Sequence, residues 1–132
     1  HLADALLRSG KPQEAIALYK DILRSNPRVL EVANQLARVL CTHPDDSIRS
    51  PQEALALAAR LCQITQNKNI NYLLTFALAK ANLEEFAEAE KLLKQLMSIS
   101  KPKSAFGTEV SKALESVASR KGVRSTLWKS GK

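Results

Sequence analysis

The sequence predicts an all-α fold in which three helical hairpins follow one another as an α-solenoid and a further helix caps the end. Two observations support this prediction. The chain is 45% hydrophobic, is dominated by Ala and Leu, and has only 4 Gly and 5 Pro, which favours helix over strand. Apolar residues also recur at three- and four-residue spacing in successive stretches that Gly, Pro or Asn separate. The 132 residues are enough to bury one core of ordinary domain size.

The first hairpin is predicted from two apolar stripes. Leu6 and Leu7 belong to a stripe that stops at Gly10, a residue suited to the left-handed turn that closes a helix. Pro12 can start the second helix, which stops at Asn26-Pro27. The buried face of this second helix is expected to consist of Ala15, Ile16, Tyr19, Ile22 and Leu23.

The second hairpin has the clearest predicted helix start. A third stripe reaches Cys41-Thr42, and a polar loop, 43–49, follows it. Ser50-Pro51-Gln52-Glu53 is typical of a capping box with Pro at the first helical position. The two stripes are Val29, Val32, Ala33, Leu36, Ala37 and Leu40, then Ala54, Leu57, Ala58, Leu61 and Cys62.

A third hairpin and a cap complete the predicted solenoid. Asn82 marks the turn between two stripes, and Thr108 is the expected N-cap of a capping helix that ends near Arg120. We therefore divide the chain into repeats at about 1–28, 29–67 and 68–101, a linker and capping helix at 102–120, and a basic flexible tail at 121–132. The stripes are Tyr72, Leu73, Phe76, Ala77 and Lys80, then Phe86, Ala89, Leu92, Leu93 and Leu96, and in the cap Val110, Ala113, Leu114 and Val117.

Aligned by their Glu-Ala pairs, the hairpins place Ala15, Ala54 and Ala89 at separations of 39 and 35 residues. This spacing is near the tetratricopeptide period of about 34 residues, and the chain resembles that family. The second unit has a longer loop between its helices and is similar to a bacterial variant of the repeat, while the third has Glu84 where the family has Gly. The first unit carries the resemblance best, through Leu2-Ala3, Leu6, Gly10, Ala15, Tyr19 and Pro27.

The resemblance implies a function in protein binding. Stacked repeats form a concave surface lined by the first helix of each hairpin, where the family binds extended peptides or partner helices. We expect a peptide-binding or protein-binding adaptor or scaffold segment of a larger protein, without catalytic activity or cofactor. Its groove would be lined by Asp4, Leu7, Glu31, Asn34, Gln35, Arg38, Cys41, Asn71, Leu74, Thr75, Leu78 and Ala81.

One known specificity of the family is disfavoured by these residues. The clamp that grips the acidic tails of heat-shock chaperones needs cations and Asn side chains around a terminal carboxylate. The matching places hold Asp4 and Gln35 where Asn is expected, and Asn71 and Thr75 where Lys and Arg are expected. An acidic tail would meet one repelling carboxylate and little positive charge.

Three alternatives remain beside the adaptor. The segment can recruit substrate for a larger enzyme such as a glycosyltransferase, or it can self-associate through apolar residues such as Leu2 and Leu6. Residues 101–132 hold 8 Lys/Arg against 2 Asp/Glu, and residues 1–100 hold 12 against 11, so the net charge of +7 lies mostly at the C-terminal end. Nucleic acid or an anionic membrane surface could therefore bind the tail through Lys121, Arg124, Trp128, Lys129 and Lys132.

Motifs for catalysis are absent from the sequence, which has no Gly-rich phosphate loop and no GxSxG. Cys41-Thr42-His43 with Asp45 and Asp46 is the best metal candidate, but helix packing by Cys41 and loop capping by Asp45 explain it more simply. Cys41 and Cys62 lack CxxC spacing, so we expect reduced thiols and a cytoplasmic protein. Because His1 is not Met and helical spacing starts at once, we expect a segment that begins inside a helix.

Overall fold

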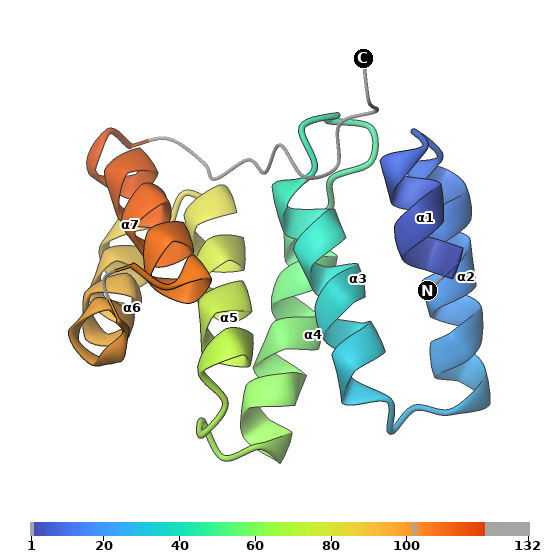
Figure 1. Cartoon of the computed structure of the whole chain (residues 1–132), viewed down its shortest axis with the longest axis horizontal. Helices are drawn as coiled ribbons and strands as arrows, with labels where there is room; N and C mark the ends of the chain where they lie inside the picture. Colours follow the sequence, from blue (N-terminus) through green and yellow to red (C-terminus); the bar gives the residue numbers. More distant parts are fainter. Residues whose placement is uncertain (1, 102, 121–132) are drawn as a thin grey trace.

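The structure is a computed structural model that describes residues 2–101 and 103–120. The residues described form seven α-helices and no β-strand, which confirms the predicted all-α class. The basic tail, with Lys121, Arg124, Trp128, Lys129 and Lys132, lies outside the described residues. The helices are α1 (Leu2–Arg8), α2 (Pro12–Ser25), α3 (Leu30–Thr42), α4 (Pro51–Ile64), α5 (Ile70–Asn82), α6 (Phe86–Ile99) and α7 (Ala105–Ala118), shown in Figure 1.

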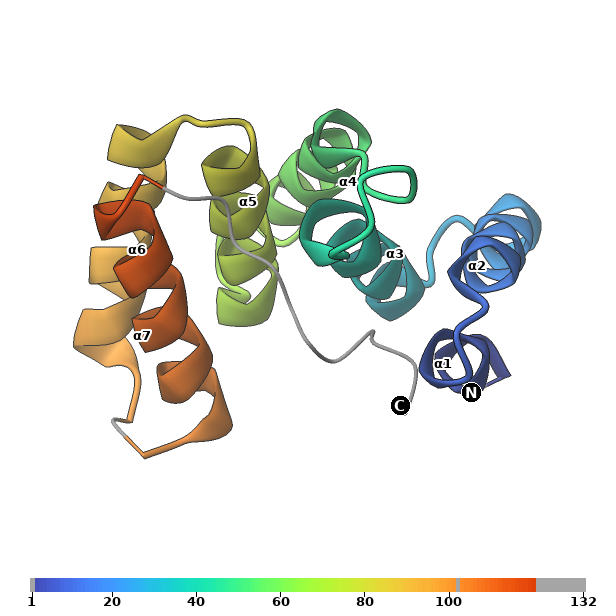
Figure 2. The same cartoon turned by 90° about the horizontal axis from the view of Figure 1, so that it is seen from above.

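The helices pack as three hairpins in series, followed by α7. The hairpins are α1 with α2, α3 with α4, and α5 with α6, and α7 packs against α6 and α5. Helices α3, α5 and α7 contact one another in succession, whereas α4 and α6 both contact α5 but not each other (Figure 2). The chain is therefore the predicted α-solenoid with a capping helix. We call the side formed by α3, α5 and α7 the inner surface.

The first hairpin is joined to the others through α2. Within the described helices, α2 contacts α3, and α1 contacts only α2 (Figure 1). Cavities of about 520 and 150 Å³ lie between α2 and α4, and Leu23 and Leu57 line both of them. An ion pair between Lys20 Nζ and Glu53 Oε2, 3.3 Å apart, spans this boundary. The first hairpin is thus less closely packed against its neighbour than the second and third are against each other.

Small residues lie where the hairpins need close helix packing. Ala15, Ala54 and Ala89 are fully buried in one continuous core, as the aligned repeats predict. Tyr19 fills space beside Ala15 and is almost completely buried. A side chain of one carbon lets two helix backbones approach, and the bulky neighbour fills the remaining gap.

Left-handed residues close two of the hairpins. Gly10 has φ of 79° and ends α1, with the Lys11 N–H donating to the Leu6 carbonyl at 2.8 Å. In the third hairpin this conformation falls on Glu84, with φ of 64°, and not on Asn82, where the sequence placed the turn. Asn82 is still helical and its side-chain amide donates to the Leu78 carbonyl at 2.9 Å. A non-glycine residue in this region costs about 1–2 kcal/mol.

The loop of the second hairpin, residues 43–50, is longer than the loops at 9–11 and 83–85, as predicted. The predicted capping box is wrong, because the Ser50 side chain makes no cap hydrogen bond. Instead the Ser50 N–H donates to the Leu40 carbonyl at 2.6 Å, and the Glu53 carboxylate pairs with Lys20. Asp45 caps the loop as expected: its Oδ1 accepts from the Ser47 N–H at 2.9 Å. The kinship of this loop with a bacterial variant stays a prediction.

The capping helix α7 begins earlier than predicted. Its N-cap is Ser104, whose hydroxyl accepts from the Gly107 N–H at 3.0 Å, so the prediction of Thr108 is wrong. Gly107 is needed for a close approach, because a Cβ built there would lie 2.3 Å from the Lys101 carbonyl oxygen. The inward stripe is as predicted, with Val110, Ala113 and Val117 buried and Leu114 partly buried.

Candidate functional site

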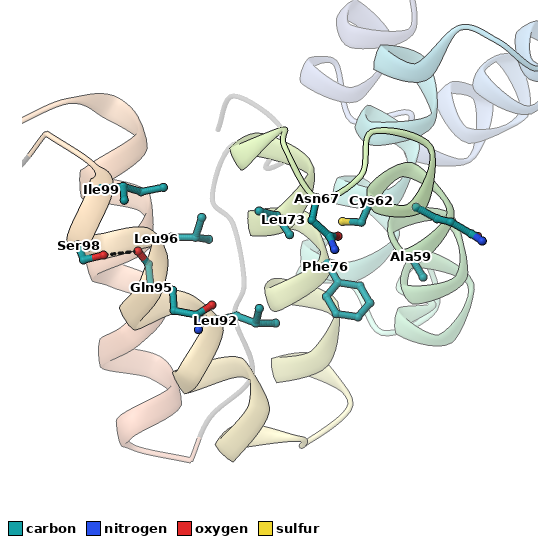
Figure 3. A pocket seen from close by; sticks show the side chains of 11 residues that line it. Ala59, Cys62, Asn67, Leu73, Phe76, Leu92, Gln95, Leu96, Ser98 and Ile99 are labelled. Carbon is teal, nitrogen blue, oxygen red and sulfur yellow. Dashed lines mark hydrogen bonds between the residues drawn. The ribbon is translucent and has the colours of Figure 1, made fainter.

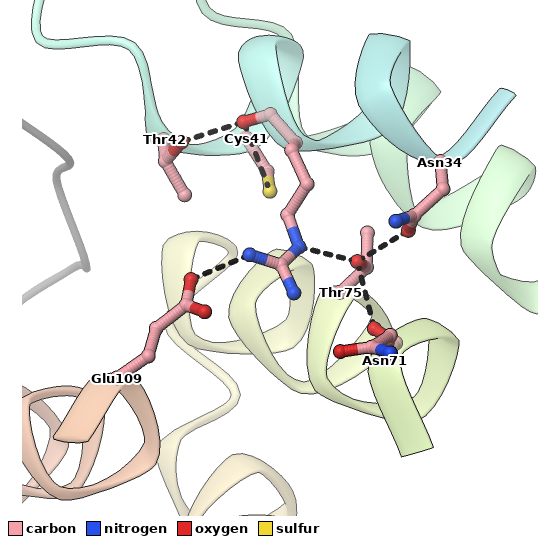
Figure 4. Close-up of polar contacts among 7 residues, drawn as sticks. Asn34, Cys41, Thr42, Asn71, Thr75 and Glu109 are labelled. Atoms are coloured by element: carbon pink, nitrogen blue, oxygen red, sulfur yellow. Dashed lines mark hydrogen bonds and ion pairs between the residues drawn. The ribbon is translucent and has the colours of Figure 1, made fainter. Parts of the chain in front are cut away.

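A polar network holds the inner surface together around Arg38. The Arg38 guanidinium Nε donates to Thr75 Oγ1 at 2.5 Å, and the Thr75 hydroxyl donates to Asn34 Oδ1 at 2.6 Å (Figure 4). Arg38 Nη1 also pairs with Glu109 Oε2 on α7 at 2.5 Å. Arg38, Asn34 and Thr75, which the sequence placed in one groove, thus come together, and they do so as an internal network linking α3, α5 and α7.

The α7 partner of this network was not predicted. Glu109 lies next to the inward stripe of α7 and points toward Arg38 (Figure 4). The Arg38 side chain is only 16% exposed and Glu109 is 43% exposed, so a protein carboxylate already occupies one side of the guanidinium. The sequence held one indication of this contact: Glu109 and Glu115 are the only acids in residues 101–132, so they are the only residues there that could pair with a cation.

Several residues of the predicted groove lie in the core. Leu74 and Leu78, where the sequence would seat an apolar side chain of a ligand, share one core with Val110, Ala113 and Val117 of α7. This part of the inner surface is therefore packed within the protein. Other predicted groove residues with no more than 1% exposure are Leu7, Cys41, Thr75 and Ala81. In this conformation they pack within the protein, and a role toward a ligand stays a prediction.

The open part of the inner surface lies near the start of α3 and α5. Glu31 and Asn71 are exposed and Gln35 is partly exposed, which leaves a carboxylate and two amides available to a partner. Burial, with a smaller contribution from the Glu31 carboxylate, raises the pKa of Tyr72. The Asp4 side chain, also predicted for the groove, lies outside the described part of the structure. Of the predicted groove, Glu31, Gln35 and Asn71 are thus the described residues best placed to meet a ligand.

A second hollow, which the sequence did not reveal, lies on the opposite side of α5. This outer groove runs between α4 and α6, with α5 beneath it, and has a volume of about 820 Å³. Figure 3 shows Leu92, Leu96 and Ile99 pointing from α6 toward α5. Leu73 and Phe76 line the α5 side, and the remaining lining residues are Ala59, Cys62, Gln63, Asn67, Gln95 and Ser98.

A charged cluster lies beside Phe76 at one end of the outer groove. Lys80 Nζ lies 5.5 Å from the centre of the Phe76 ring and 2.8 Å from Glu88 Oε2 on α6. Glu85 Oε1 is 3.5 Å from the same ammonium. The hydrogen bond to Glu88 raises the pKa of Lys80, and the same contact lowers the pKa of Glu88. These contacts tie α5 to α6 at the beginning of α6.

The residues considered for a metal site or for catalysis are engaged in packing. Cys41 is buried and its thiol contacts the Arg38 carbonyl, Sγ to O 3.7 Å. His43 is buried, its Nδ1 accepts from the Asp45 N–H at 3.1 Å, and burial lowers its pKa. Burial also raises the pKa of the Cys62 thiol, which makes the reactive thiolate less accessible. Among the described residues, no group of three or more His, Cys, Asp or Glu is placed to hold a metal ion.

These features define an α-helical repeat protein with two candidate binding surfaces. The family model for the tetratricopeptide repeat matches residues 1–39, which span α1, α2 and most of α3. The match covers the first hairpin and most of α3, and the all-helical stack of hairpins is similar to the arrangement of tetratricopeptide repeats. Repeats of this family are typically non-catalytic scaffolds that mediate protein–protein interactions. No curated protein and no solved structure matches the chain. A bilayer-spanning helix is not found in the part of the chain that the structure describes.

Proposed function

We propose that this chain is a non-catalytic adaptor or scaffold segment that binds a peptide or a partner helix through its inner surface, and that it needs no cofactor. The observation that carries the proposal is the open strip of Glu31, Gln35 and Asn71 beside the Arg38 network. Amide side chains can donate to and accept from an extended peptide backbone, and the Thr75 hydroxyl of the network bonds the Asn71 carbonyl at 3.1 Å.

Residues of the inner surface near α7 are already paired or buried, so the proposed binding site includes fewer residues than the groove predicted from the sequence. Glu109 already pairs with Arg38, and Leu74 and Leu78 are buried in the core. A ligand that keeps this arrangement would bind along α3 and the first turns of α5. Two buried, unbridged cysteines, Cys41 and Cys62, support placing this adaptor in a reducing compartment such as the cytoplasm.

The proposal is tested by a pull-down from a lysate of the source organism. The test variant carries Glu31→Ala, Gln35→Ala and Asn71→Ala on the inner surface. Its matched control carries Glu14→Ala, Gln13→Ala and Gln52→Ala, which remove the same chemical groups from exposed positions on α2 and α4. Circular dichroism verifies that both variants keep the wild-type helicity.

We expect a salt-resistant protein partner that is retained by the control and lost by the inner-surface variant. Retention of that partner by both variants would show that the partner does not bind at the inner surface. Recovery of nucleic acid or lipid by both variants, lost at moderate salt, would move the function to the basic residues of 121–132.

A further inference from the structure

We propose that the outer groove between α4 and α6 is a second docking site, and that it takes an amphipathic helix of a partner protein with an apolar stripe and acidic flanks. The proposal does not depend on the inner surface. The outer groove has a volume of about 820 Å³, which is in the range of ligand sites, roughly 300–1,000 Å³.

The shape of the outer groove fits a helix. Helices α4 and α6 run in the same direction, and each is antiparallel to α5, which lies between and beneath them (Figures 1 and 3). Because α4 and α6 do not touch, the space above α5 is the position that a further helix would fill in a layered helical packing. Apolar side chains at three- and four-residue spacing on that helix would meet Leu73, Phe76 and Leu92.

One apolar residue of the outer groove lacks a full packing partner. Ile99, at the end of α6, is 64% exposed and lines the groove together with Leu96. Gln63, Asn67 and Gln95 surround this apolar floor with amides. An apolar centre with a polar rim is the arrangement of protein interfaces, in which buried anchors supply most of the binding energy.

The charge of the rim selects the partner. Lys68 follows the lining residue Asn67, and Lys91 lies one helical turn before Gln95, and neither has a carboxylate within ion-pair distance in the described part of the chain. The acids of α6 are already engaged, Glu88 by Lys80 and Glu90 by Lys94 at 3.4 Å. The rim therefore presents uncompensated positive charge, which favours a partner with Asp or Glu beside its apolar stripe.

The same charge disfavours two other occupants. Residues 121–132 contain four Lys/Arg and no Asp/Glu, so this segment has the sign of the rim. A second copy of the chain carries the same net charge of +7 and would bring lysines against lysines. An acidic helix from another protein is the occupant that the charges support.

The test uses the full chain and two labelled peptides of about 15 residues, roughly four helical turns. Both peptides carry Leu at positions i, i+3, i+4 and i+7, flanked by Glu in one and by Lys in the other. Fluorescence anisotropy measures their dissociation constants for the wild type, Ile99→Asp, Lys91→Glu and Ile64→Asp. Ile64 is the matched control, because it is 53% exposed at the end of α4 but lines the cavity between α2 and α4.

We expect the Glu peptide to bind about tenfold more tightly than the Lys peptide, because opposite charges meet only in the first case. Ile99→Asp should weaken the Glu peptide by about tenfold, since it places a carboxylate in the apolar floor. Lys91→Glu should weaken the Glu peptide and strengthen the Lys peptide. Ile64→Asp should leave both dissociation constants within about twofold of wild type, as expected for a site away from the contact.

Equal binding of the two peptides, or equal effects of Ile99→Asp and Ile64→Asp, would overturn the proposal. A dimer that forms with rising concentration and disappears in Ile99→Asp would assign the outer groove to a second copy and would also overturn it. The inner-surface triple variant distinguishes this proposal from the first one. It should bind the Glu peptide as the wild type does, and a loss in that variant would place the peptide on the inner surface.

Discussion

The first hairpin and α5 differ in how many neighbours support them. Among the described helices, α1 contacts only α2, and α2 packs on the second hairpin through α3 and an ion pair to α4. Helix α5 packs against α3, α4, α6 and α7. In a repeat stack each unit is stabilised by its nearest neighbours, so a unit with one interface opens more easily than a unit with two. We therefore expect local opening to begin in α1 and α2, and unfolding of α5 to disrupt the whole stack.

The largest expected effect is that of a cavity in α5. Leu74→Ala should lower the free energy of unfolding by about 2–5 kcal/mol, because Leu74 is fully buried in the core shared with α7. Leu7→Ala removes an equally buried side chain from α1. Hydrogen exchange should show faster exchange throughout the chain in Leu74→Ala, and mainly in α1 and α2 in Leu7→Ala. The same exchange pattern in both variants would show that the hairpins unfold as one unit.

Overpacking the second hairpin should have an intermediate effect. Ala54 has no exposed surface and belongs to the same core as Ala15 and Tyr19 of the first hairpin. Ala54→Leu should destabilise the protein by about 1–3 kcal/mol, because added methyl groups force neighbouring side chains from their preferred rotamers. Urea denaturation measures the change. An unchanged midpoint would mean that the space around Ala54 can accept a leucine.

The ion pair that joins the second hairpin to α7 and the one that joins it to the first hairpin should differ in strength, each below about 1 kcal/mol. Arg38 pairs with Glu109 at 2.5 Å and is mostly buried, whereas Lys20 and Glu53, 3.3 Å apart, are each more than 40% exposed. Double-mutant cycles with Arg38→Met and Glu109→Gln, and with Lys20→Met and Glu53→Gln, should give the larger coupling for the first pair. A larger coupling for Lys20 and Glu53 would contradict the weaker attachment of the first hairpin.

The smallest expected effect is a pH dependence from the loop of the second hairpin. Burial keeps the pKa of His43 below its ordinary value of 6.5, although the Asp45 carboxylate opposes the shift. The unfolded chain therefore binds a proton first as the pH falls below about 6.5, and stability is lost as the pH drops through the folded-state pKa. Thermal unfolding from pH 7.5 to 5 should show this loss in the wild type and a smaller one in His43→Gln. Equal slopes would assign the pH dependence to other groups.

Helix periodicity was sufficient to predict the fold. The stripes around Ala15, Ala54 and Ala89 report local packing, and each hairpin buries them as the spacing requires. Local polar contacts were harder to predict. Ser50 and Glu53 have the spacing of a capping box, but the Ser50 N–H bonds the Leu40 carbonyl and the Glu53 carboxylate pairs with Lys20. A residue pattern shows which groups are near in sequence, and these partners come from other elements.

The candidate sites were harder to predict than the helix caps, because they depend on contacts between residues far apart in the sequence. Sequence placed Arg38 and Thr75 in one groove, and the structure brings them together, but their partner Glu109 belongs to a helix predicted only as a cap. The outer groove could not be read from periodicity, because Leu92 and Leu96 look like ordinary core positions. They line a groove because α4 and α6 stay apart, a property of three helices together.

Gly107 shows how a single atom can decide the shape of the inner surface. With no Cβ, the start of α7 lies directly against the Lys101 carbonyl, and two residues later Glu109 reaches Arg38. A methyl group at Gly107 would push the start of α7 away from the Lys101 carbonyl and would shift Glu109 relative to Arg38. A one-carbon change outside both proposed sites would then alter how far the Arg38 guanidinium is shielded.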